Sequence, residues 1–421
     1  MTSHTLSQVL LSLAFIVALA RLGGFLFERI GQPAVVGELV AGIAAGPSVL
    51  GLVAPQVKDF LLPADAVPYL NLLAQLGLVI FMLVVGLEVE MMTLGRRKRT
   101  VTAVATGAVA LPFALGLTIG LVIERWYRTP AGFVPFILYM GVALSITAFP
   151  VLARILRDRG MTSTLVGSIA LACAAIIDAA AWLVLAAVVA VAGHGSRPAW
   201  LMLTIVTVFV VVMLFAVRPG LAALQRRGVF DRMSPRAILI GVLVAAVLAA
   251  WFTESIGLHS IFGPFIVGLS LPRVRNTTEL IVTRAADLSS GLLLPAFFVV
   301  AGLQVDVTAL SGRDVLVLTV VLAAAVIGKV VGGAAPARLT GLSSRDSITL
   351  GVLLNTRGLT ELVVLSVGKA AGLLTTPLYT VLVITAVVTT MATGPLLQLI
   401  ERRAGKLEDG KVNEEWIRAS M

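Results

Sequence analysis

The stretch AAIIDAAAWLVLA, residues 174–186, places Asp178 in an apolar segment that runs from about 163 to 192 without another charge. A segment of this length and hydrophobicity is typical of a helix that crosses a bilayer. A carboxylate at that depth is costly, and such groups usually mark a path for ions or protons. Because it is desolvated, it can hold a proton or a cation but not both, which is in itself a basis for exchange. The alternative is a protonated aspartate that only hydrogen-bonds a neighbouring helix.

The rest of the chain is similarly apolar. Of its 421 residues, 58 % are hydrophobic and 13 % are charged, far from the usage of a soluble domain. Apolar stretches of about 20 residues recur, each long enough to cross a hydrocarbon core of roughly 30 Å as a helix. The alternating segments of a membrane β-barrel are lacking. We therefore predict an all-α polytopic membrane protein.

Hydropathy and the charged interruptions predict thirteen spans. They cover about 7–27, 34–53, 67–90, 101–123, 133–154, 163–192, 199–218, 236–253, 258–271, 286–303, 314–336, 346–368 and 376–400. Residues 1–400 are thus expected to form a single membrane transporter domain, and 401–421 a short cytoplasmic tail with no attached regulatory domain. The apolar run near the N-terminus lacks a cleavage site and is interpreted as a retained first helix.

The formal net charge of +10 comes from basic residues clustered between the apolar runs. This placement favours membrane topology over nucleic-acid binding as its explanation. The predicted loops hold 23 basic residues on one side of the membrane and 6 on the other. The bias predicts an odd number of spans in the inner (plasma) membrane, with the N-terminus outside and the C-terminus in the cytoplasm.

The fifth span carries LSITAFPVLARIL, residues 144–156, in which Pro150 lacks a backbone donor and Ser145 and Thr147 supply hydroxyls. Broken helices in transporters expose backbone carbonyls that coordinate cations near the middle of the membrane. Ser145, Thr147 and Asp178 are therefore the predicted ion- and proton-binding residues, with Thr147 and Asp178 as ligands of a monovalent cation. The alternative for the fifth span is an ordinary proline kink.

The twelfth span carries LLNTRGLTELVVLSVG, residues 353–368, with Asn355, Arg357 and Glu361 in an otherwise apolar helix. Arg357 and Glu361 are four residues apart and can pair on one helix face, which reduces the cost of burying each. A purely structural pair is the alternative. The fifth and twelfth spans hold corresponding late positions on either side of a central seventh span, which indicates a site between inverted repeats.

Two further charged groups complete a predicted core charge network with Arg357, Glu361 and Asn355. Lys329, in GKVVGG at 328–333, is expected to have an acidic partner in the core, as a second proton carrier or as a counter-charge. Glu38 lies in a glycine-rich second span that favours close helix packing, and it either belongs to that packing or contacts an end of a broken helix.

Metal and enzyme chemistry find little support in the sequence. Cys173 is the single cysteine, and His4, His194 and His259 are scattered. We therefore expect no metal site built from cysteine or histidine, and no catalytic constellation of nucleophile and base. The expected classification is a non-enzyme without cofactors.

Seven stretches in order along the chain together resemble the monovalent cation:proton antiporter-2 family, particularly the branch with plant cation/proton exchangers and bacterial Kef-like proteins. They are QPAVVGELVAGIAAGPSVLG (32–51), LAQLGLVIFMLVVGLEVE (73–90), LSITAFPVLARIL, IGLHSIFGPFIVGLSLP (256–272), LLLPAFFVVAGLQVDV (292–307), GKVVGG and LLNTRGLTELVVLSVG.

The resemblance implies an inverted-repeat antiporter fold whose fifth and twelfth spans are unwound and cross near Asp178. It also implies a homodimer in membrane lipid, with a core of about 67–192 and 286–368 that moves against a scaffold like an elevator. Carried over to this sequence, it makes Asp178 the essential aspartate, Thr147 the threonine of the unwound segment and Lys329 the lysine of the core.

One residue departs from the wider superfamily, which commonly has Asp-Asp or Asn-Asp where this chain has Ile177 and Asp178. With a single carboxylate, the simplest coupling is one proton for one cation. The expected function is secondary antiport of a monovalent cation, Na⁺ or K⁺, for H⁺, with no net charge moved. The alternatives are a passive ion pathway or transport of another solute on the same fold.

Overall fold

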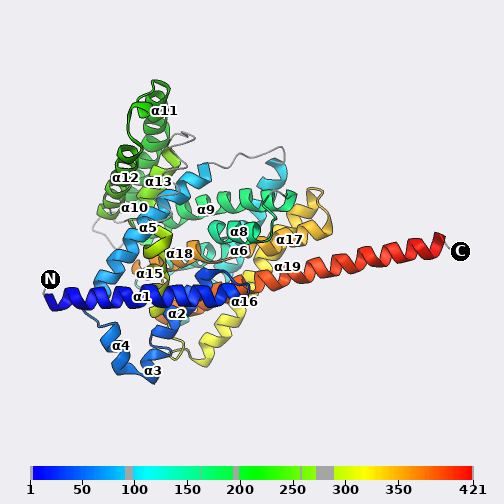
Figure 1. The fold of residues 1–421 in the computed structure, drawn as a ribbon, viewed down its shortest axis with the longest axis horizontal. Helices are drawn as coiled ribbons and strands as arrows, with labels where there is room; N and C mark the ends of the chain where they lie inside the picture. The colour runs from blue at the N-terminus through cyan, green and yellow to red at the C-terminus, as the bar shows by residue number, and fades with distance from the viewer. Residues whose placement is uncertain are drawn as a thin grey trace.

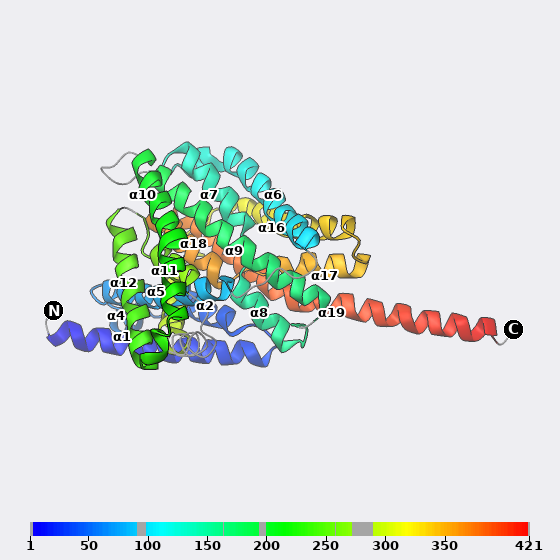
Figure 2. The ribbon, with the colours of Figure 1, turned by 90° about the horizontal axis from the view of Figure 1, so that it is seen from above.

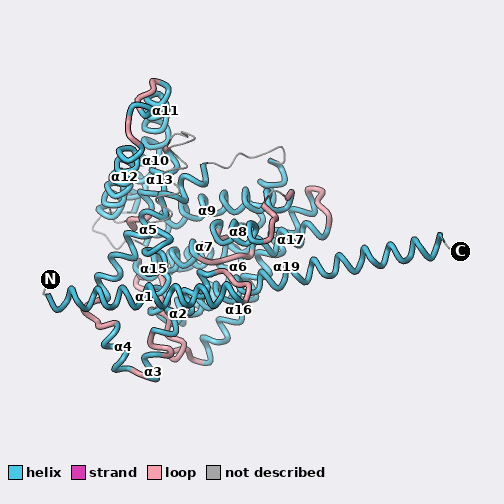
Figure 3. Tube along the Cα trace, viewed as in Figure 1, coloured by secondary structure: helices cyan, strands magenta, loops and turns pink. Residues whose placement is uncertain are grey.

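The computed structural model describes residues 3–90, 98–162, 164–192, 199–256, 258–271 and 289–419. Within these ranges the regular structure is helical throughout, with no strand (Figure 3). The all-α polytopic fold predicted from the hydropathy pattern is therefore confirmed. The helices form two bundles, which we call the first and the second bundle.

The first bundle contains the first three long helices of each half of the chain, and the two sets pack on one another. Its long members are α1 (Ser3–Arg29), α2 (Ala34–Ala45), α5 (Val67–Glu90), α12 (Pro235–Ser255), α13 (Phe262–Ser270) and α15 (Leu294–Leu303). Short helices α3 (Leu50–Val53), α4 (Pro55–Leu61) and η4 (Ser289–Leu293) flank them. Between the halves lie α10 (Ala199–Val212), η2 (Met213–Val217), α11 (Arg218–Arg226) and η3 (Phe230–Arg232).

The second bundle contains the helices around Asp178. They are α6 (Lys98–Ile123), followed by η1 (Glu124–Trp126), then α7 (Phe133–Ser145), α8 (Phe149–Asp158), α9 (Leu165–Ala192), α16 (Gly312–Leu339), α17 (Ser344–Leu354), α18 (Leu359–Ala370) and α19 (Thr376–Ala419). The predicted core range differs in membership from this bundle. α5 and α15, which lie in that range, pack with α2 and α13, whereas α19, which lies outside it, packs with α16, α17 and α18.

The predicted number of thirteen spans is not confirmed, because ten helices in the described ranges are long and apolar enough to cross a membrane. Three predicted spans are not among these ten. Span 258–271 contains only the short α13, span 286–303 contains α15 with its first residues outside the described ranges, and span 346–368 is divided into α17 and α18.

The two chain halves pack in the same pattern. In the first bundle α2 contacts α1 and α15, and α13 likewise contacts α12 and α5. In the second bundle α6 contacts α7 and α9, and α16 likewise contacts α17 and α19. The packing is therefore the same in both halves when each helix is matched to its equivalent. The matched pairs are α1 with α12, α2 with α13, α5 with α15, α6 with α16, α7–α8 with α17–α18, and α9 with α19. This is the predicted inverted repeat, with α10 and α11 between its halves.

Equivalent glycines permit the two equivalent close contacts in the first bundle. A Cβ atom at Gly42 of α2 would lie 2.7 Å from the Cα atom of Val299 in α15. A Cβ atom at Gly86 of α5 would lie 3.0 Å from the Cα atom of Gly268 in α13. Only glycine lets these backbones approach so closely, as in other small-residue helix contacts within membranes.

The same repeat is visible in the sequence around these glycines. GLEVE at 86–90 corresponds to GLQVD at 302–306, and GELVAG at 37–42 corresponds in spacing to GPFIVG at 263–268. Both pairs lie on helices that the packing pattern equates. These matches are too short to indicate a repeat by themselves, and the packing of the helices is what identifies them as equivalent.

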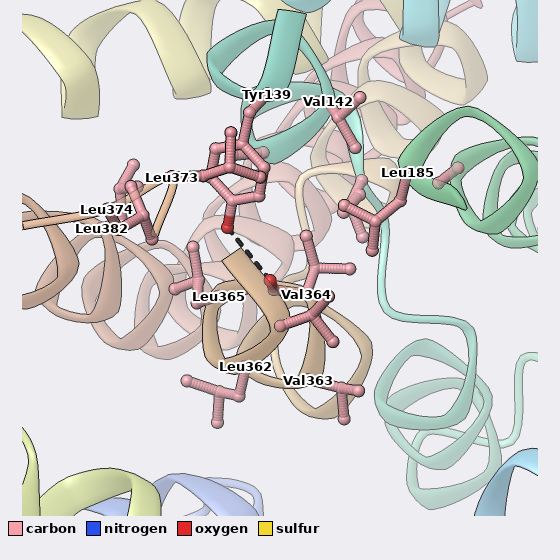
Figure 4. Packing of buried hydrophobic residues seen from close by; sticks show 14 of the residues in the cluster. Tyr139, Val142, Leu185, Leu362, Val363, Val364, Leu365, Leu373, Leu374 and Leu382 are labelled. Carbon is pink, nitrogen blue, oxygen red and sulfur yellow. Dashed lines mark hydrogen bonds between the residues drawn. The ribbon is translucent and has the colours of Figure 1, made fainter. Parts of the chain in front are cut away.

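The interface between the bundles is apolar. One hydrophobic cluster joins Trp182 of α9 and Leu362 of α18 with Phe265 of α13 and Phe297 of α15. Figure 4 shows the part of this cluster that lies within the second bundle, where the Tyr139 hydroxyl of α7 donates a 3.0 Å hydrogen bond to the Val364 carbonyl of α18. The two ends of the chain lie at opposite ends of the molecule, and α19 extends beyond its body (Figures 1 and 2).

Candidate ion-binding site

The fifth span is broken rather than kinked. α7 ends at Ser145, residues 146–148 are not helical, and α8 begins at Phe149. Pro150 lies in the first turn of α8, where a helix tolerates proline because the N–H groups there have no partner in the helix. The proline therefore starts a second half-helix, and the sequence prediction of a break is confirmed.

The twelfth span is broken between Leu354, where α17 ends, and Leu359, where α18 begins. Gly358 in the break has φ of 153° and ψ of −126°, a conformation that residues with a Cβ atom rarely adopt. A Cβ atom there would also lie 2.7 Å from a methyl carbon of Val151 in α8. The glycine thus permits both the break and its contact with the other broken helix.

The two broken segments cross and bind each other. The Ala148 amide donates to the Thr356 carbonyl at 3.0 Å, and the Thr147 hydroxyl donates to the Leu354 carbonyl at 2.9 Å. The C-terminal ends of α7 and α17 therefore meet the N-terminal ends of α8 and α18. Helix C-termini carry partial negative charge and N-termini partial positive charge, so the crossing offers places for both cations and anions.

Asp178 lies at the positive ends. Its Oδ2 accepts hydrogen bonds from the amide of Phe149, at 3.2 Å, and from the hydroxyl of Thr360, at 3.4 Å. These donors come from the first turns of α8 and α18. The side chain is fully buried, and its Oδ1 has no hydrogen-bond partner among the described residues. One oxygen thus remains available for a proton or a cation.

Lys329 of α16 lies at the negative end of α7. Its ammonium donates to the Ser145 carbonyl and, at 2.7 Å, to the Thr147 hydroxyl. The acidic partner expected for Lys329 is not in direct contact with it, because neutral oxygens at the end of α7 take that place. Lys329 interacts with Asp178 only electrostatically, without a direct ion pair.

Arg357 also neutralises the end of α7, and it forms the predicted pair with Glu361 across one helical turn. Its guanidinium donates to the carbonyls of Ala143, at 3.0 Å, and Leu144, at 2.7 Å. Both members of the pair are fully buried. The arginine thus binds the first broken helix while belonging to the second.

The other predicted residues take varied positions. The Ser145 hydroxyl donates to the Val142 carbonyl of its own helix, so its carbonyl rather than its hydroxyl joins the cluster. Asn355 is buried in the break, and neither atom of its amide has a partner among the described residues. Glu38 lies apart from this cluster, on α2 against Gly24 of α1.

Sequence reasoning missed two hydroxyls that hold the crossing. Thr360 donates to Asp178, and Thr390 of α19 binds both the backbone N–H, at 3.2 Å, and the carbonyl, at 2.6 Å, of Arg357. The repeat equates α19 with α9, and Thr390 accepts from a backbone N–H of one broken segment as Asp178 accepts from a backbone N–H of the other. A buried threonine is common in membrane helices, so only the repeat would have drawn attention to it.

The available donors suit a hard monovalent cation rather than a resident transition metal. The described residues contain no group of three or more His, Cys, Asp or Glu side chains. Among the described residues, the buried oxygens near the crossing that have no hydrogen-bond partner are Asp178 Oδ1, Asn355 Oδ1, Thr356 Oγ1 and Glu361 Oε2. Carboxylate, amide and hydroxyl oxygens are ligands of hard cations, which here would be cargo.

A cavity on one side of the molecule and an ion pair on the other distinguish its two sides. A cavity of 620 Å³ lies between the bundles on the side where α1 begins, with Asn71, Gln304, Ser366 and Lys369 in its lining. On the opposite side, Glu28 of α1 and Arg154 of α8 form an ion pair that joins the bundles. The bundles therefore separate on one side and meet on the other.

An inverted repeat with two broken helices that cross around buried charges is the architecture of a secondary transporter. The chain belongs to the sodium/hydrogen exchanger transmembrane family, whose pattern it matches over residues 13–400. The resemblance to cation/proton antiporters inferred from the motifs is thereby confirmed.

Several antiporters from other organisms are similar to this chain in sequence. The Na⁺/H⁺ antiporter NhaS4 of Synechocystis is 37 % identical over 94 % of this chain and 98 % of its own length. Cation/H⁺ antiporter 20 of Arabidopsis thaliana is 38 % identical over 93 % of this chain, and K⁺/H⁺ antiporter 1 of Saccharomyces cerevisiae 31 % over 95 %. The chain spans about half the length of these plant and yeast proteins, 48 % and 47 %.

The fold is also found among solved structures. The sodium proton antiporter MjNhaP1 of Methanocaldococcus jannaschii at pH 8 superposes with a TM-score of 0.64 and 16 % identity, covering 94 % of this chain and 98 % of that one. This similarity supports the fold.

Proposed function

We propose that this protein is a secondary antiporter that exchanges a monovalent cation, Na⁺ or K⁺, for H⁺ through Asp178. One observation carries the proposal: a fully buried carboxylate accepts hydrogen bonds from the first turns of α8 and α18, and its other oxygen has no partner in the part of the chain that the structure describes. A proton and a cation would compete for that oxygen. Relatives named as Na⁺/H⁺ and K⁺/H⁺ antiporters support the assignment.

In the proposed cycle the second bundle carries Asp178 and moves against the first, in the manner of an elevator. The apolar interface between the bundles favours such sliding, because it contains few bonds that must break. The cavity between the bundles and the Glu28–Arg154 pair correspond to a state open on the side where α1 begins and closed on the other. Movement of the second bundle that closes the cavity would break the Glu28–Arg154 pair and open the side on which that pair lies.

One carboxylate gives one-for-one exchange in this proposal. Asp178, Glu361, Lys329 and Arg357 together carry no net charge when all are ionised. Adding either a proton or a monovalent cation at Asp178 gives the moving bundle the same charge. Ile177, beside Asp178, cannot titrate, so no second acidic group is available at that position.

We further propose that the protein acts as a homodimer in the plasma membrane, with its N-terminus outside and its C-terminus in the cytoplasm. The excess of basic residues in alternate loops supports this orientation. Residues 1–400 would form the transporter domain and 401–421 a tail on the cytoplasmic side.

The test is proton movement in vesicles that contain the purified protein, measured with a pH-sensitive dye as Na⁺ or K⁺ is added. We expect each transported cation to release protons and Asp178→Asn to abolish the release while the protein stays folded. Asp231→Asn, an exposed aspartate in η3, is the matched control and is expected to retain activity. Cation-driven proton release by Asp178→Asn would refute the proposal, and cation flux without proton movement would indicate a passive pathway instead.

A further inference from the structure

A groove between α6 and α9 lies on the face of the second bundle turned away from the first. Its volume is 450 Å³, and α6, α7 and α9 form its walls. α6 packs against helices of its own bundle, α7, α9 and α16, and Figure 2 shows it on the edge of the molecule opposite α1. The groove therefore faces the lipid around the protein and is separate from the cavity between the bundles.

The length of the groove matches one leaflet of a bilayer. On α6 its lining includes Thr102, Thr106, Val109 and Phe113, a spacing of three to four residues that places them along one helix face. From Thr102 to Phe113 the helix rises about 16 Å at 1.5 Å per residue, and half of a hydrocarbon core is about 15 Å. The groove thus reaches from the membrane surface at the start of α6 to the middle of the bilayer.

The walls of the groove suit a hydrocarbon chain. α9 contributes Ile176, Ile177, Ala180 and Val184. Ile176 and Val184 are 37 % and 41 % exposed, so the groove is open toward lipid along its length. Threonine hydroxyls in a helix can donate to carbonyls of their own backbone, so Thr102 and Thr106 do not exclude an apolar occupant.

Basic residues lie at the membrane-surface end of the groove. Lys98 and Arg99 begin α6 and are exposed. They precede Thr102 by four and three residues, so they share its helix face and project away from the bilayer centre. A phosphate at the end of a chain in the groove would meet these two side chains.

We propose that the α6–α9 groove binds an anionic phospholipid, with one acyl chain along the groove and the phosphate at Lys98 and Arg99. Charge and length together select this occupant, because a zwitterionic lipid gains less from two cations and a soluble ligand cannot reach the groove from water. Binding does not depend on the proposed antiport and is tested separately from it.

The bound chain would lie beside the ion-binding site. The groove lining includes Ser145, whose carbonyl accepts from Lys329, and Ile177, which precedes Asp178. An apolar side chain at position 177 is compatible with a neighbouring acyl chain, whereas a carboxylate there would be buried against it. The groove thus gives a physical reason for isoleucine at this position.

The experiment uses the full-length protein in phosphatidylcholine vesicles with trace phosphatidylglycerol or phosphatidylcholine that carries a photoreactive diazirine at mid-chain. Cross-linked peptides are identified by mass spectrometry. We expect phosphatidylglycerol to label segments 102–113 and 176–184 in preference to phosphatidylcholine. Removing the charges in Lys98→Gln and Arg99→Gln should lower that preference by about fivefold for each charge.

Ala180→Phe fills the groove and should abolish labelling of both segments. Ile327→Phe, at an exposed site on α16, and Arg226→Gln with Arg227→Gln, exposed at the end of α11, are the matched controls and should leave labelling unchanged. The charge variants alter only exposed side chains, so they keep the test decisive if Ala180→Phe fails to fold. Equal labelling by both lipids, or equal labelling of the groove and the rest of the lipid-facing surface, would overturn the proposal.

Discussion

At the scale of single residues, each charged side chain at the crossing lies at a helix end of the opposite sign. Asp178 accepts from the first turns of α8 and α18, while Lys329 and Arg357 donate to the last carbonyls of α7. Because the helix ends stabilise these charges, the groups can remain ionised where an isolated charge would be costly. The proton or cation at Asp178 is then the one charge that changes during exchange.

The charge count predicts electroneutral exchange. Each net charge moved across a membrane potential would contribute about 2.3 kcal/mol per 100 mV, so an electrogenic cycle would respond clearly to voltage. Lys329 donates to the Ser145 carbonyl and the Thr147 hydroxyl rather than to Asp178, and we expect it to retain its proton when Asp178 exchanges its ligand. In vesicles with a potassium-valinomycin potential and a sodium gradient, the rate should be unchanged by the potential. A current that disappears in Lys329→Gln would show instead that the lysine carries a second proton.

Arg357 and Glu361 should be coupled energetically but not equally sensitive. Removing one member of a buried pair costs roughly 3 to 5 kcal/mol. Arg357→Met should be the more harmful change, because it leaves Glu361 and the carbonyls of Ala143 and Leu144 without their donor. In Glu361→Gln, Arg357 still donates hydrogen bonds to both carbonyls. Thermal unfolding of both single variants and the double variant measures the coupling. Additive losses would argue against the pair.

At the scale of elements, the ion pair between α1 and α8 is the contact most directly affected by relative movement of the bundles. In a protein with Cys173→Ala, we introduce cysteines at Glu28 and Arg154 and join them with a short cross-linker that forms a disulfide bond with each cysteine. Cross-linking should stop transport, and reduction of these disulfides should restore it. Cysteines at Arg159 and Gly394, which lie in the second bundle on the same side and contact each other, form the control pair. Cross-linking there should leave transport intact, and undiminished transport with the first pair linked would contradict movement at this contact.

The broken helices show how far local sequence predicts an element. Pro150 indicated the first break, because proline fits the first turn of a helix better than its interior. The second break has no proline, and its polar residues read equally as a continuous helix with a buried ion pair. Gly358, whose backbone conformation requires glycine, is the local signal there, but glycine is too common in membrane helices to be decisive.

At the scale of the whole molecule, the termini at opposite ends of the structure agree with an odd number of crossings (Figure 1). The proposed orientation predicts which loops reagents reach in intact cells. In the Cys173→Ala background, a cysteine at the exposed Asp65 should react with a membrane-impermeant maleimide from outside. A cysteine at the exposed Arg227 should react only after the cells are opened. The reverse labelling pattern would invert the topology.

The sequence by itself determined the class of fold, the lengths of most helices and the residues of greatest chemical interest. Hydrophobic segments must match the bilayer and buried charges are costly, so both leave strong signals along a single chain. Asp178, Lys329, Arg357 and Glu361 stood out for that reason.

Only the tertiary structure decided which groups those charges meet. Lys329 was expected to find a carboxylate and instead binds oxygens at the end of α7, while Glu38 lies against α1. Thr360 and Thr390 became part of the site only through the crossing. The physical reason is that a buried charge can be balanced by backbone dipoles, which every residue carries, so the sequence does not mark them. Their positions are set when the two repeats pack and four helix ends converge.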